Sequence, residues 1–183
     1  MTGATGFVGS HAVASMLAAG HDVRCIVRDP ARLDGALSAT DRERVDVAVG
    51  DVLDAASVRR ALDGCDAVLH AAGAVGVSRA HSGSRDVNVE GTTHVIGQAA
   101  AAGCDAILYT SSIVVLDDSV PTMTAETPLG APSGPYGRSK RDAELVARHH
   151  QAAGDPVASF YVGGVFGPEC PDVASGMSGI IGV

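Results

Sequence analysis

The sequence predicts an α/β fold, in which a doubly wound parallel sheet is covered by helices on both faces. Three observations predict this fold class. Short apolar segments alternate with longer segments of helical pattern along the chain, which is typical of βαβ units. The short segments are apolar on both faces, as the buried strands of a parallel sheet are. A glycine-rich turn opens the first helical segment.

Five short segments are the expected strands, because each is a mostly apolar run between polar or glycine-containing stretches. They are Val23–Val27, Val45–Val49, Ala67–Ala71, Ala106–Thr110 and Val157–Val162. Two longer irregular segments, Gly73–Arg85 and Leu116–Pro135, follow the carboxyl ends of expected strands. Open α/β sheets bind their ligands at these ends, so we expect both segments to lie near a ligand site.

Four segments with apolar residues at helical spacing are the expected helices. They are Val8–Ala19, Ala55–Leu62, Val87–Ala102 and Tyr136–Ala153. Three of them end directly before a glycine, as many helices do. The last one also follows Pro135, and proline is favoured in the first turn of a helix.

Composition limits the functions open to the chain. Its 183 residues suffice for one domain, and 46% hydrophobic residues with a mean hydropathy of +0.20 exclude a disordered or fibrous chain. With 13 basic and 21 acidic residues the net charge is −8, which disfavours nucleic acid as a partner. No apolar run has the length of a membrane span, and no secretory signal is visible, so we expect a cytoplasmic protein.

The cysteines point neither to a metal site nor to a redox motif. Cys25, Cys65, Cys104 and Cys170 are spread singly along the chain, without the spacing of a CxxC motif or a metal-binding cluster. We therefore expect reduced cysteines that pack in the interior, and no bound metal.

A glycine-rich turn, Thr2–Gly9, carries glycines at positions 3, 6 and 9 directly before the first helix. Such a turn brings backbone N–H groups and a helix N-terminus against a diphosphate, and glycine leaves room for that approach. A tight turn without a ligand is the alternative, but the helix and strand that follow favour a nucleotide site. The predicted cofactor contacts in this turn are Gly3, Thr5, Gly6, Phe7, Val8 and Gly9.

The end of the next expected strand bears on the choice of cofactor. Arg28 stands 25 residues after Gly3, followed by Asp29 and by Arg32. In dinucleotide-binding folds an acidic residue near this place binds the ribose 2′-hydroxyl of NAD, whereas an arginine accommodates the 2′-phosphate of NADP. Arg28 is therefore a predicted cofactor contact, and NADP(H) is favoured over NAD(H). Asp29 is compatible with NAD, and a solvated pair of arginines is the alternative.

Two further strand ends supply predicted cofactor contacts. The Asp51 carboxylate either accepts a hydrogen bond from an adenine amino group or belongs to a helix N-cap region shared with Asp54. Small residues follow His70 and let the backbone lie against a cofactor, while His70 itself is expected to be a hydrogen-bonded core histidine. The predicted contacts at these two strand ends are Asp51, Val52, Ala71, Ala72 and Gly73.

Lys140 is the only lysine of the chain, against 12 arginines, and it lies four residues after Tyr136. This spacing puts both side chains on one helix face, where an ammonium favours a phenolate and thus proton transfer. Lysine also suits hydrogen bonding to ribose hydroxyls, so both residues are predicted to contact the cofactor. At the end of the strand Ala106–Thr110, Ser112 is the first choice and Ser111 the second for a hydroxyl that orients the substrate against Tyr136.

Together these motifs resemble the extended short-chain dehydrogenase/reductase family, also described as the NAD-dependent epimerase/dehydratase family. The resemblance covers residues 2 to about 168 and rests on TGATGFVG, VRCIVRDP, GDVLD, HAAG, NVEGT, YTSS, YGRSK and GGVFGP. It implies a Rossmann-type sheet, a nicotinamide dinucleotide and a catalytic triad of Ser112, Tyr136 and Lys140. It also implies that Asn88 braces the strand Ala67–Ala71 near the cofactor.

Within this family the motifs VRDP and YTSSI are most similar to dihydroflavonol reductases and 3β-hydroxysteroid dehydrogenases. Sugar dehydratases carry an acidic pair where Ile113 and Val114 stand here, and sugar epimerases usually show Val-Tyr-Gly where this chain has Val-Leu-Asp. The family's common Arg-Pro is replaced by Tyr161 and Val162. The resemblance therefore implies hydride transfer between a ketone and a secondary alcohol of a fairly apolar small molecule. A sugar or sugar-nucleotide epimerase and a non-catalytic NAD(P)-binding fragment are the alternatives.

Both ends of the chain depart from the family pattern. The family has an apolar strand before Thr2, where only Met1 stands here, and it continues past GGVFGP with a smaller substrate-binding domain. We therefore expect residues 1–168 to form an NAD(P)-binding domain without its first strand, and residues 169–183 to begin a missing substrate-binding region. A misassigned start site is a hypothesis that explains Met1, and a homodimer is one assembly to consider.

Overall fold

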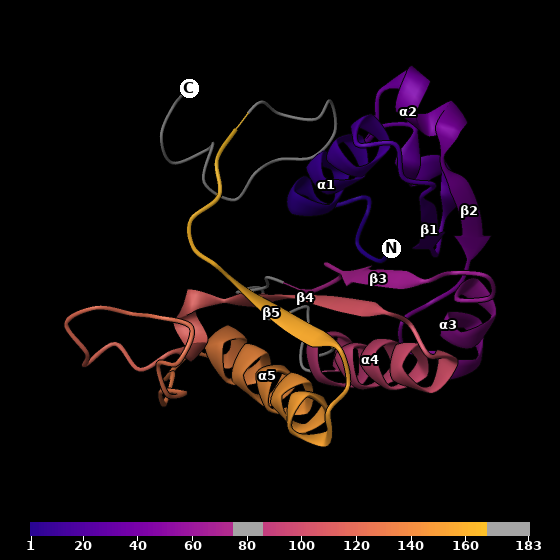
Figure 1. Ribbon diagram of the computed structural model, residues 1–183. Coiled ribbons are helices and arrows are strands. Elements are labelled where there is room, and N and C mark those ends of the chain that lie inside the picture. The colour runs from indigo at the N-terminus through magenta and orange to yellow at the C-terminus, as the bar shows by residue number, and fades with distance from the viewer. Residues whose placement is uncertain (75–85, 168–183) are drawn as a thin grey trace.

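The computed structural model describes residues 1–74 and 86–167 and shows an α/β fold (Figure 1). The helices are α1 (Phe7–Ala18), α2 (Ala39–Arg44), α3 (Ala55–Ala61), α4 (Gly91–Ala102) and α5 (Pro135–Ala153). The strands are β1 (Arg24–Val27), β2 (Asp46–Val49), β3 (Ala67–His70), β4 (Ala106–Ser112) and β5 (Val157–Val162). Two 3-10 turns, η1 (Pro30–Leu33) and η3 (Ile113–Val115), and a π-helical turn, η2 (Asp86–Glu90), complete the described elements.

The described strands pair only in parallel. β1 pairs with β2, and β4 lies between β3 and β5. Thr2 stands between the two groups of strands and forms parallel bridges to Ile26 of β1 and to His70 of β3. The Thr2 N–H donates to the Leu69 carbonyl at 3.0 Å, and the Ile26 N–H donates to the Met1 carbonyl at 2.9 Å. Met1 and Thr2 thus connect β1 to β3 through backbone hydrogen bonds.

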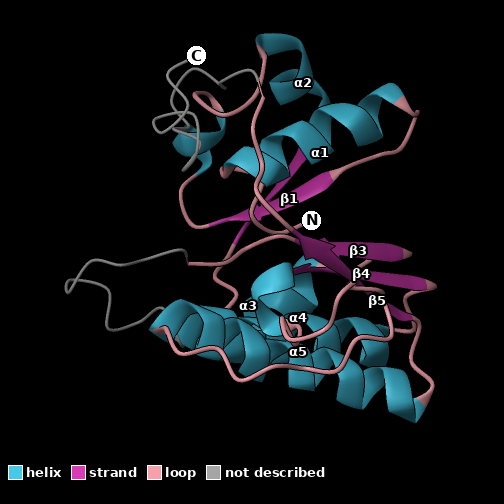
Figure 2. Cartoon of the chain, turned by 90° about the vertical axis from the view of Figure 1, so that its left-hand side faces the viewer, coloured by secondary structure: helices cyan, strands magenta, loops and turns pink. Residues whose placement is uncertain are grey.

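Helices cover both faces of this arrangement of strands. Figure 2 shows α1 and α2 on one side of the strands and α3, α4 and α5 on the other. The predicted Rossmann-type α/β fold, doubly wound around parallel strands, is confirmed. Among the described residues no helix has both the length and the apolar character needed to cross a membrane.

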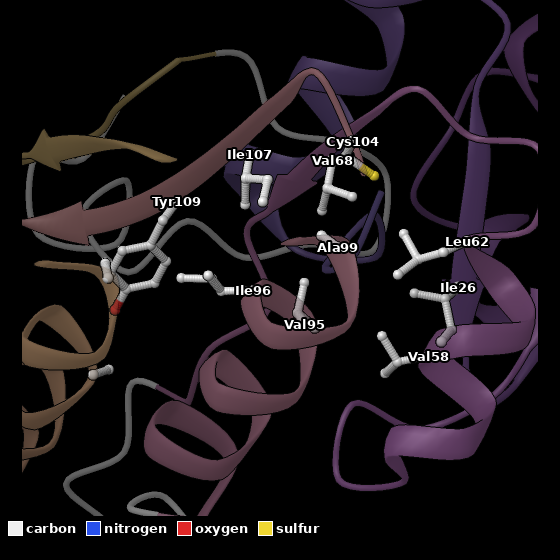
Figure 3. Close-up of a cluster of buried hydrophobic side chains, with 12 residues drawn as sticks. Ile26, Val58, Leu62, Val68, Val95, Ile96, Ala99, Cys104, Ile107 and Tyr109 are labelled. Atoms are coloured by element: carbon white, nitrogen blue, oxygen red, sulfur yellow. The ribbon is translucent and has the colours of Figure 1, made fainter. Parts of the chain in front are cut away.

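Two buried clusters hold the layers together, and β1 contributes to both because its side chains alternate between the faces. Cys25 and Val27 pack with α1 residues such as Val13, whereas Ile26 packs on the opposite face. Figure 3 shows the second cluster, in which side chains of α4 meet those of β3 and β4, with Tyr109 at its outer end. The described residues of this cluster are Ile26, Val58, Leu62, Val68, Val95, Ile96, Ala99, Cys104, Ile107, Tyr109, Ala143 and Ala147.

The nine expected elements are present with ends shifted by one or two residues, except that α4 proper begins at Gly91 and its expected first turn is π-helical. α2, η1 and η3 were not predicted from the sequence. α2 has six residues and none of them is buried, so it leaves no apolar periodicity in the sequence. Its start does carry a signal, since the Ser38 hydroxyl accepts a hydrogen bond from the Asp41 N–H. The predicted tail 169–183, Cys170 and most of the segment Gly73–Arg85 lie outside the described residues.

Candidate functional site

A cavity of about 290 Å³ lies at the carboxyl ends of β1, β2 and β3. Parallel sheets bind nucleotides at this edge, because the loops that follow the strands converge there. The residues that line it are Gly3, Ala4, Thr5, Gly6, Ile26, Val27, Arg28, Asp29, Arg32, Gly50, Asp51, Val52, Ala71, Ala72, Gly73 and Val87. The walls thus come from five segments that are far apart in the sequence.

Nine of the predicted cofactor contacts line this cavity: Gly3, Thr5, Gly6, Arg28, Asp51, Val52, Ala71, Ala72 and Gly73. Phe7, Val8 and Gly9 do not line it and form the first turn of α1 instead. Sequence reasoning missed Ala4, Ile26, Val27, Gly50 and Val87 as wall residues. The first four lie within two residues of predicted contacts, whereas only the tertiary fold brings Val87 of η2 to this place.

The distances around Gly3 and Gly9 explain why the turn needs glycine at these positions. Gly3 has φ +77°, and a Cβ atom there would stand 2.5 Å from backbone atoms of Ala71 and Ala72. A Cβ atom on Gly9 would stand 2.0 Å from the Gly3 carbonyl oxygen. Gly3 therefore allows the turn to contact the end of β3, and Gly9 allows α1 to pack against the turn.

The start of α1 fits the diphosphate of a dinucleotide. Its N-cap is Gly6, which lines the cavity and offers no side chain to cap the first N–H groups of the helix. These N–H groups lack partners within the helix and carry the positive end of its dipole. A cradle of glycines beside a helix N-terminus is a suitable place for a phosphate anion. Phe7 and Val8 belong to this first turn of α1.

The opposite wall of the cavity carries two exposed arginines, Arg28 and Arg32, with Asp29 between them in the sequence. The Asp29 carboxylate caps η1, since its Oδ1 accepts a hydrogen bond from the Ala31 N–H at 3.0 Å. One carboxylate oxygen of Asp29 is thus engaged locally, while Arg28 and Arg32 both line the cavity.

The structure assigns the two aspartates after β2 to different places. Asp54 is the N-cap of α3, and its Oδ1 accepts from the Ala56 N–H at 2.9 Å. The Asp51 Oδ1 accepts from the Leu53 N–H at 3.0 Å, and Asp51 also lines the cavity. The helix cap therefore belongs to Asp54, which leaves the interpretation of Asp51 as a ligand residue open.

His70 is a core histidine, as expected. It is fully buried, its Nδ1 lies 2.7 Å from the Thr2 hydroxyl and its Nε2 lies 3.0 Å from the Thr92 hydroxyl. Burial lowers the pKa of His70 to about 3, and the positive charge of Lys140 acts in the same direction. The ring is therefore neutral at physiological pH and links the N-terminal segment to α4.

Lys140 is held at the carboxyl end of β4. Only 6% of its surface is exposed, and its Nζ donates a hydrogen bond to the Thr110 carbonyl at 2.7 Å. The same nitrogen stands 4.7 Å from the centre of the Tyr109 ring. Burial lowers the pKa of Lys140 to about 8, and the negative charge of Glu144 opposes this shift. The ammonium is thus desolvated and ordered, which is unusual for a lysine side chain.

The N-terminal turn of α5 approaches the turn that follows Ser112. α5 begins at Pro135, so Tyr136 lies one helical turn before Lys140, and α5 packs against η3. A Cβ atom on Gly137 would stand 3.4 Å from the Val114 side chain. Ser112 is the last residue of β4, and its hydroxyl accepts a weak hydrogen bond of 3.4 Å from the Val114 N–H. The structure thus places the first turn of α5, which carries Tyr136, near the turn η3 that follows Ser112.

The alternative serine, Ser111, is more deeply buried. Its exposed fraction is 2%, against 9% for Ser112, and its hydroxyl has no hydrogen-bond partner among the described residues. Neither serine lines the cavity described above, nor do Tyr136 and Lys140. Within the same described residues, no group of three His, Cys, Asp or Glu side chains is placed to hold a metal ion.

Asn88 connects the cavity wall to the helix that carries Tyr136 and Lys140. It is 1% exposed, and its Oδ1 accepts from the Ala74 N–H at 2.8 Å. Its Nδ2 donates to the Ser139 hydroxyl at 2.9 Å, directly beside Lys140 in the sequence. Asn88 thus holds Ala74, in the segment that follows β3, rather than the strand itself.

Comparison with known proteins agrees with this geometry. The sequence profile of the NAD dependent epimerase/dehydratase family matches residues 1–182. The chain is 43% identical over 119 residues to cinnamoyl-CoA reductase 1 of Oryza sativa subsp. japonica, which covers 61% of this chain and 33% of that protein. It is 34% identical over 192 residues to UDP-glucose 4-epimerase of Neisseria meningitidis serogroup A, which covers 100% of this chain and 55% of that protein.

Among solved structures, the enzyme WbmG of Bordetella bronchiseptica in complex with NAD and UDP superposes with a TM-score of 0.76 at 26% identity. The match covers 91% of this chain and 53% of WbmG. The chain thus spans between a third and about half of the length of these three relatives. The family profile extends over almost every residue. The chain belongs to the NAD-dependent epimerase/dehydratase family.

Proposed function

We propose that the chain forms the cofactor-binding part of an NAD(P)-dependent oxidoreductase that interconverts a ketone and a secondary alcohol by hydride transfer. Residues 1–168 are the proposed NAD(P)-binding domain. The observation that carries the proposal is the buried position of Lys140, one helical turn after Tyr136 and at the carboxyl end of β4. A buried lysine without a function is costly, because its charge is removed from water.

In the proposed mechanism the nicotinamide ring, when bound, supplies or accepts the hydride. Tyr136 gives a proton to the substrate oxygen during ketone reduction and takes it back during alcohol oxidation. Lys140 stabilises negative charge on the Tyr136 oxygen and donates hydrogen bonds to ribose hydroxyls. Ser112 donates a hydrogen bond to the reacting oxygen and so fixes its distance from Tyr136.

The residues after Ser112 support a fairly apolar substrate. Ile113 and Val114 are 45% and 40% exposed, directly beside the proposed catalytic serine. An exposed apolar pair at a catalytic centre favours an apolar substrate flank over a charged or hydroxyl-rich one. This supports a small-molecule ketone or alcohol as the partner.

The arginines at the cavity support NADP(H) as the preferred cofactor. Arg28 and Arg32 both line the wall at the end of β1, and a guanidinium group binds phosphate through paired hydrogen bonds. The Asp29 oxygen that caps η1 is engaged, which weakens it as a ligand for a ribose 2′-hydroxyl. NAD is the alternative, and the solved structure of WbmG contains NAD.

Binding and turnover test the proposal separately. The chain has no Trp, so the fluorescence of bound NADPH can be followed against a low protein background. We expect NADPH to bind, and Tyr136→Phe to lower turnover of an apolar ketone by about 10²-fold or more while NADPH affinity stays nearly unchanged. Absence of binding at millimolar NADPH contradicts the proposal. Binding together with turnover that does not depend on Tyr136, or with no turnover, favours a non-catalytic NAD(P)-binding role.

An epimerase is the second candidate, favoured by the match to UDP-glucose 4-epimerase over 100% of this chain. In an epimerase the hydride leaves the substrate and returns to it, so no cofactor is consumed. Absorbance of NADPH during the reaction separates the two functions. Stoichiometric oxidation of NADPH by a ketone supports the oxidoreductase, whereas interconversion of a nucleotide sugar without change in absorbance supports the epimerase.

Removal of the Arg28 side chain tests the cofactor preference. We expect Arg28→Ala to weaken NADPH binding by about tenfold, since a charged hydrogen bond to phosphate contributes about 1.5–3 kcal/mol. NADH binding should change little, because NADH lacks the 2′-phosphate. Arg42→Ala is the matched control, since Arg42 pairs with Asp34 at 2.8 Å and does not line the cavity. Equal weakening of NADPH and NADH by Arg28→Ala contradicts the preference.

A further inference from the structure

Lys140 has an ionisable neighbour that neither the motifs nor the proposed mechanism uses. Among the described residues, only two charged side chains of the Lys, Arg, Asp and Glu types are buried. They are Lys140, which is 6% exposed, and Glu144, which is 0% exposed. They stand four residues apart on α5, so they are neighbours on one face of the helix. Burial of a charge is costly unless an opposite charge or hydrogen bonds compensate it. Two buried opposite charges on one helix face are therefore electrostatically coupled.

The Glu144 carboxylate is held in place from two elements. Its Oε1 accepts a hydrogen bond from the Tyr161 hydroxyl of β5 at 2.8 Å and a weaker one from Arg148 Nε at 3.4 Å. Arg148 in turn donates to the Tyr161 hydroxyl at 3.0 Å and to the Thr127 carbonyl at 3.4 Å. The other oxygen, Oε2, is buried and has no hydrogen-bond partner among the described residues. The carboxylate is thus fixed but only half compensated by hydrogen bonds.

The charge of Glu144 acts on the groups that surround Lys140. It raises the pKa of Lys140 against the larger effect of burial, and together with burial it raises the pKa of Tyr109, the ring below the Lys140 ammonium. The ionisable groups that interact with Glu144 are Lys140 and Arg148 on α5, Tyr109 on β4 and Tyr161 on β5. Lys140 is the only one of these four that the proposed mechanism uses.

We propose that Glu144 is a positioning residue for Lys140, whose buried carboxylate keeps the lysine side chain charged despite its own burial. Without this carboxylate, burial favours the neutral amine, which attracts a negative Tyr136 oxygen far less. Tyr161 and Arg148 hold the carboxylate in its position. The role in catalysis rests on the proposed function, whereas the coupling between Glu144 and Lys140 is testable without cofactor or substrate.

The single lysine of the chain makes this coupling directly measurable. After labelling with lysine that carries ¹³C at Cε, the 183-residue chain gives one lysine signal, and its change with pH reports the pKa of Lys140. We expect Glu144→Gln to lower this pKa by about one pH unit, since loss of a nearby opposite charge disfavours the ammonium. Tyr161→Phe is the matched control, because it removes a hydrogen bond to the same carboxylate and keeps its charge. Its lysine signal should titrate close to that of the wild type.

A second variant tests the opposite sign. Arg148→Gln removes the cation that hydrogen-bonds to the Glu144 carboxylate. The negative charge of Glu144 is then less compensated, so the pKa of Lys140 should rise. This variant also decides the question if Glu144→Gln does not fold. A lysine signal that titrates in Glu144→Gln at the wild-type pH, or one that shifts downward in Arg148→Gln, overturns the proposal.

Turnover as a function of pH then tests the role in catalysis. In Glu144→Gln the alkaline limb of kcat/KM should move to lower pH by the same amount as the lysine signal, and Tyr161→Phe should leave it in place. A limb that stays in place in Glu144→Gln overturns the catalytic role. If the wild type reduces no ketone, the proposed function fails, while the lysine titration still decides whether Glu144 controls the charge of Lys140.

Discussion

The glycines of the turn Thr2–Gly9 meet different steric requirements, although their spacing in the sequence is regular. Gly3 needs both a positive φ and contact with the end of β3, and Gly9 stands where a Cβ atom would overlap the Gly3 carbonyl. Gly6 is different, since a Cβ atom there would be at an ordinary 3.4 Å from the nearest atom outside its chain neighbours. Gly6 lines the cavity, so its lack of a side chain serves the ligand and not the packing.

Substitution by alanine separates these two roles. We expect Gly9→Ala to lower the free energy of unfolding by about 1–3 kcal/mol, because the backbone must shift to remove the overlap. Gly6→Ala should change stability by less than about 1 kcal/mol but weaken NADPH binding, because its methyl group occupies space in the cavity. Urea denaturation and NADPH titration of both variants provide the measurements. A larger loss of stability in Gly6→Ala than in Gly9→Ala contradicts this assignment.

The helix α5 was predicted from the sequence, but the burial of its charged side chains was not. The spacing of Tyr136 and Lys140 predicted a helix with both side chains on one face, and the structure has this helix. Glu144 and Arg148 continue the same row, and a row of charged residues on a helix normally faces water. Here Lys140 and Glu144 are buried, because the row packs against β4 and β5. No local pattern in the sequence indicates this burial, so Glu144 was missed.

The strands and longer helices were predictable, whereas the short elements were not. Apolar runs and helical periodicity mark elements that contribute to the core, such as β4 with Ile107 and Tyr109. α2 and η1 depend on capping hydrogen bonds that the side chains of Ser38 and Asp29 accept from backbone N–H groups, and single side chains of this kind leave little pattern. The sequence therefore predicts the elements that bury apolar side chains. Elements held by one or two local hydrogen bonds are not predictable in this way.

At the scale of the whole molecule, Met1, Thr2 and His70 connect the two groups of strands. Thr2 bridges β1 and β3 through its backbone, and its hydroxyl accepts a hydrogen bond from the Ala72 N–H at 3.1 Å. His70 joins the Thr2 hydroxyl to Thr92 of α4. Because the ring is fully buried and the positive charge of Lys140 acts on it, protonation of His70 is unfavourable in the folded chain.

The stability of the fold should therefore fall in acid. The pKa of His70 is about 3 in the folded chain and about 6.5 when unfolded, so the unfolded state binds more protons between these values. From pH 7 to pH 5 the free energy of unfolding should decrease by about 2 kcal/mol on this account. His70→Gln keeps a neutral hydrogen-bonding group and should remove this part of the decrease. Urea denaturation at both pH values measures it, and equal decreases in the two proteins contradict the role of His70.

The sequence by itself determined the α/β class, the order of the main elements, the glycine-rich turn and the pair of Tyr136 and Lys140. These features depend on local spacing, periodicity and residue type, which are present in the sequence. The tertiary structure decided that Val87 joins the cavity wall and that Glu144 is buried beside Lys140. Both outcomes depend on which segments meet in space and on which face of a helix packs against the strands. Local sequence carries no signal for either.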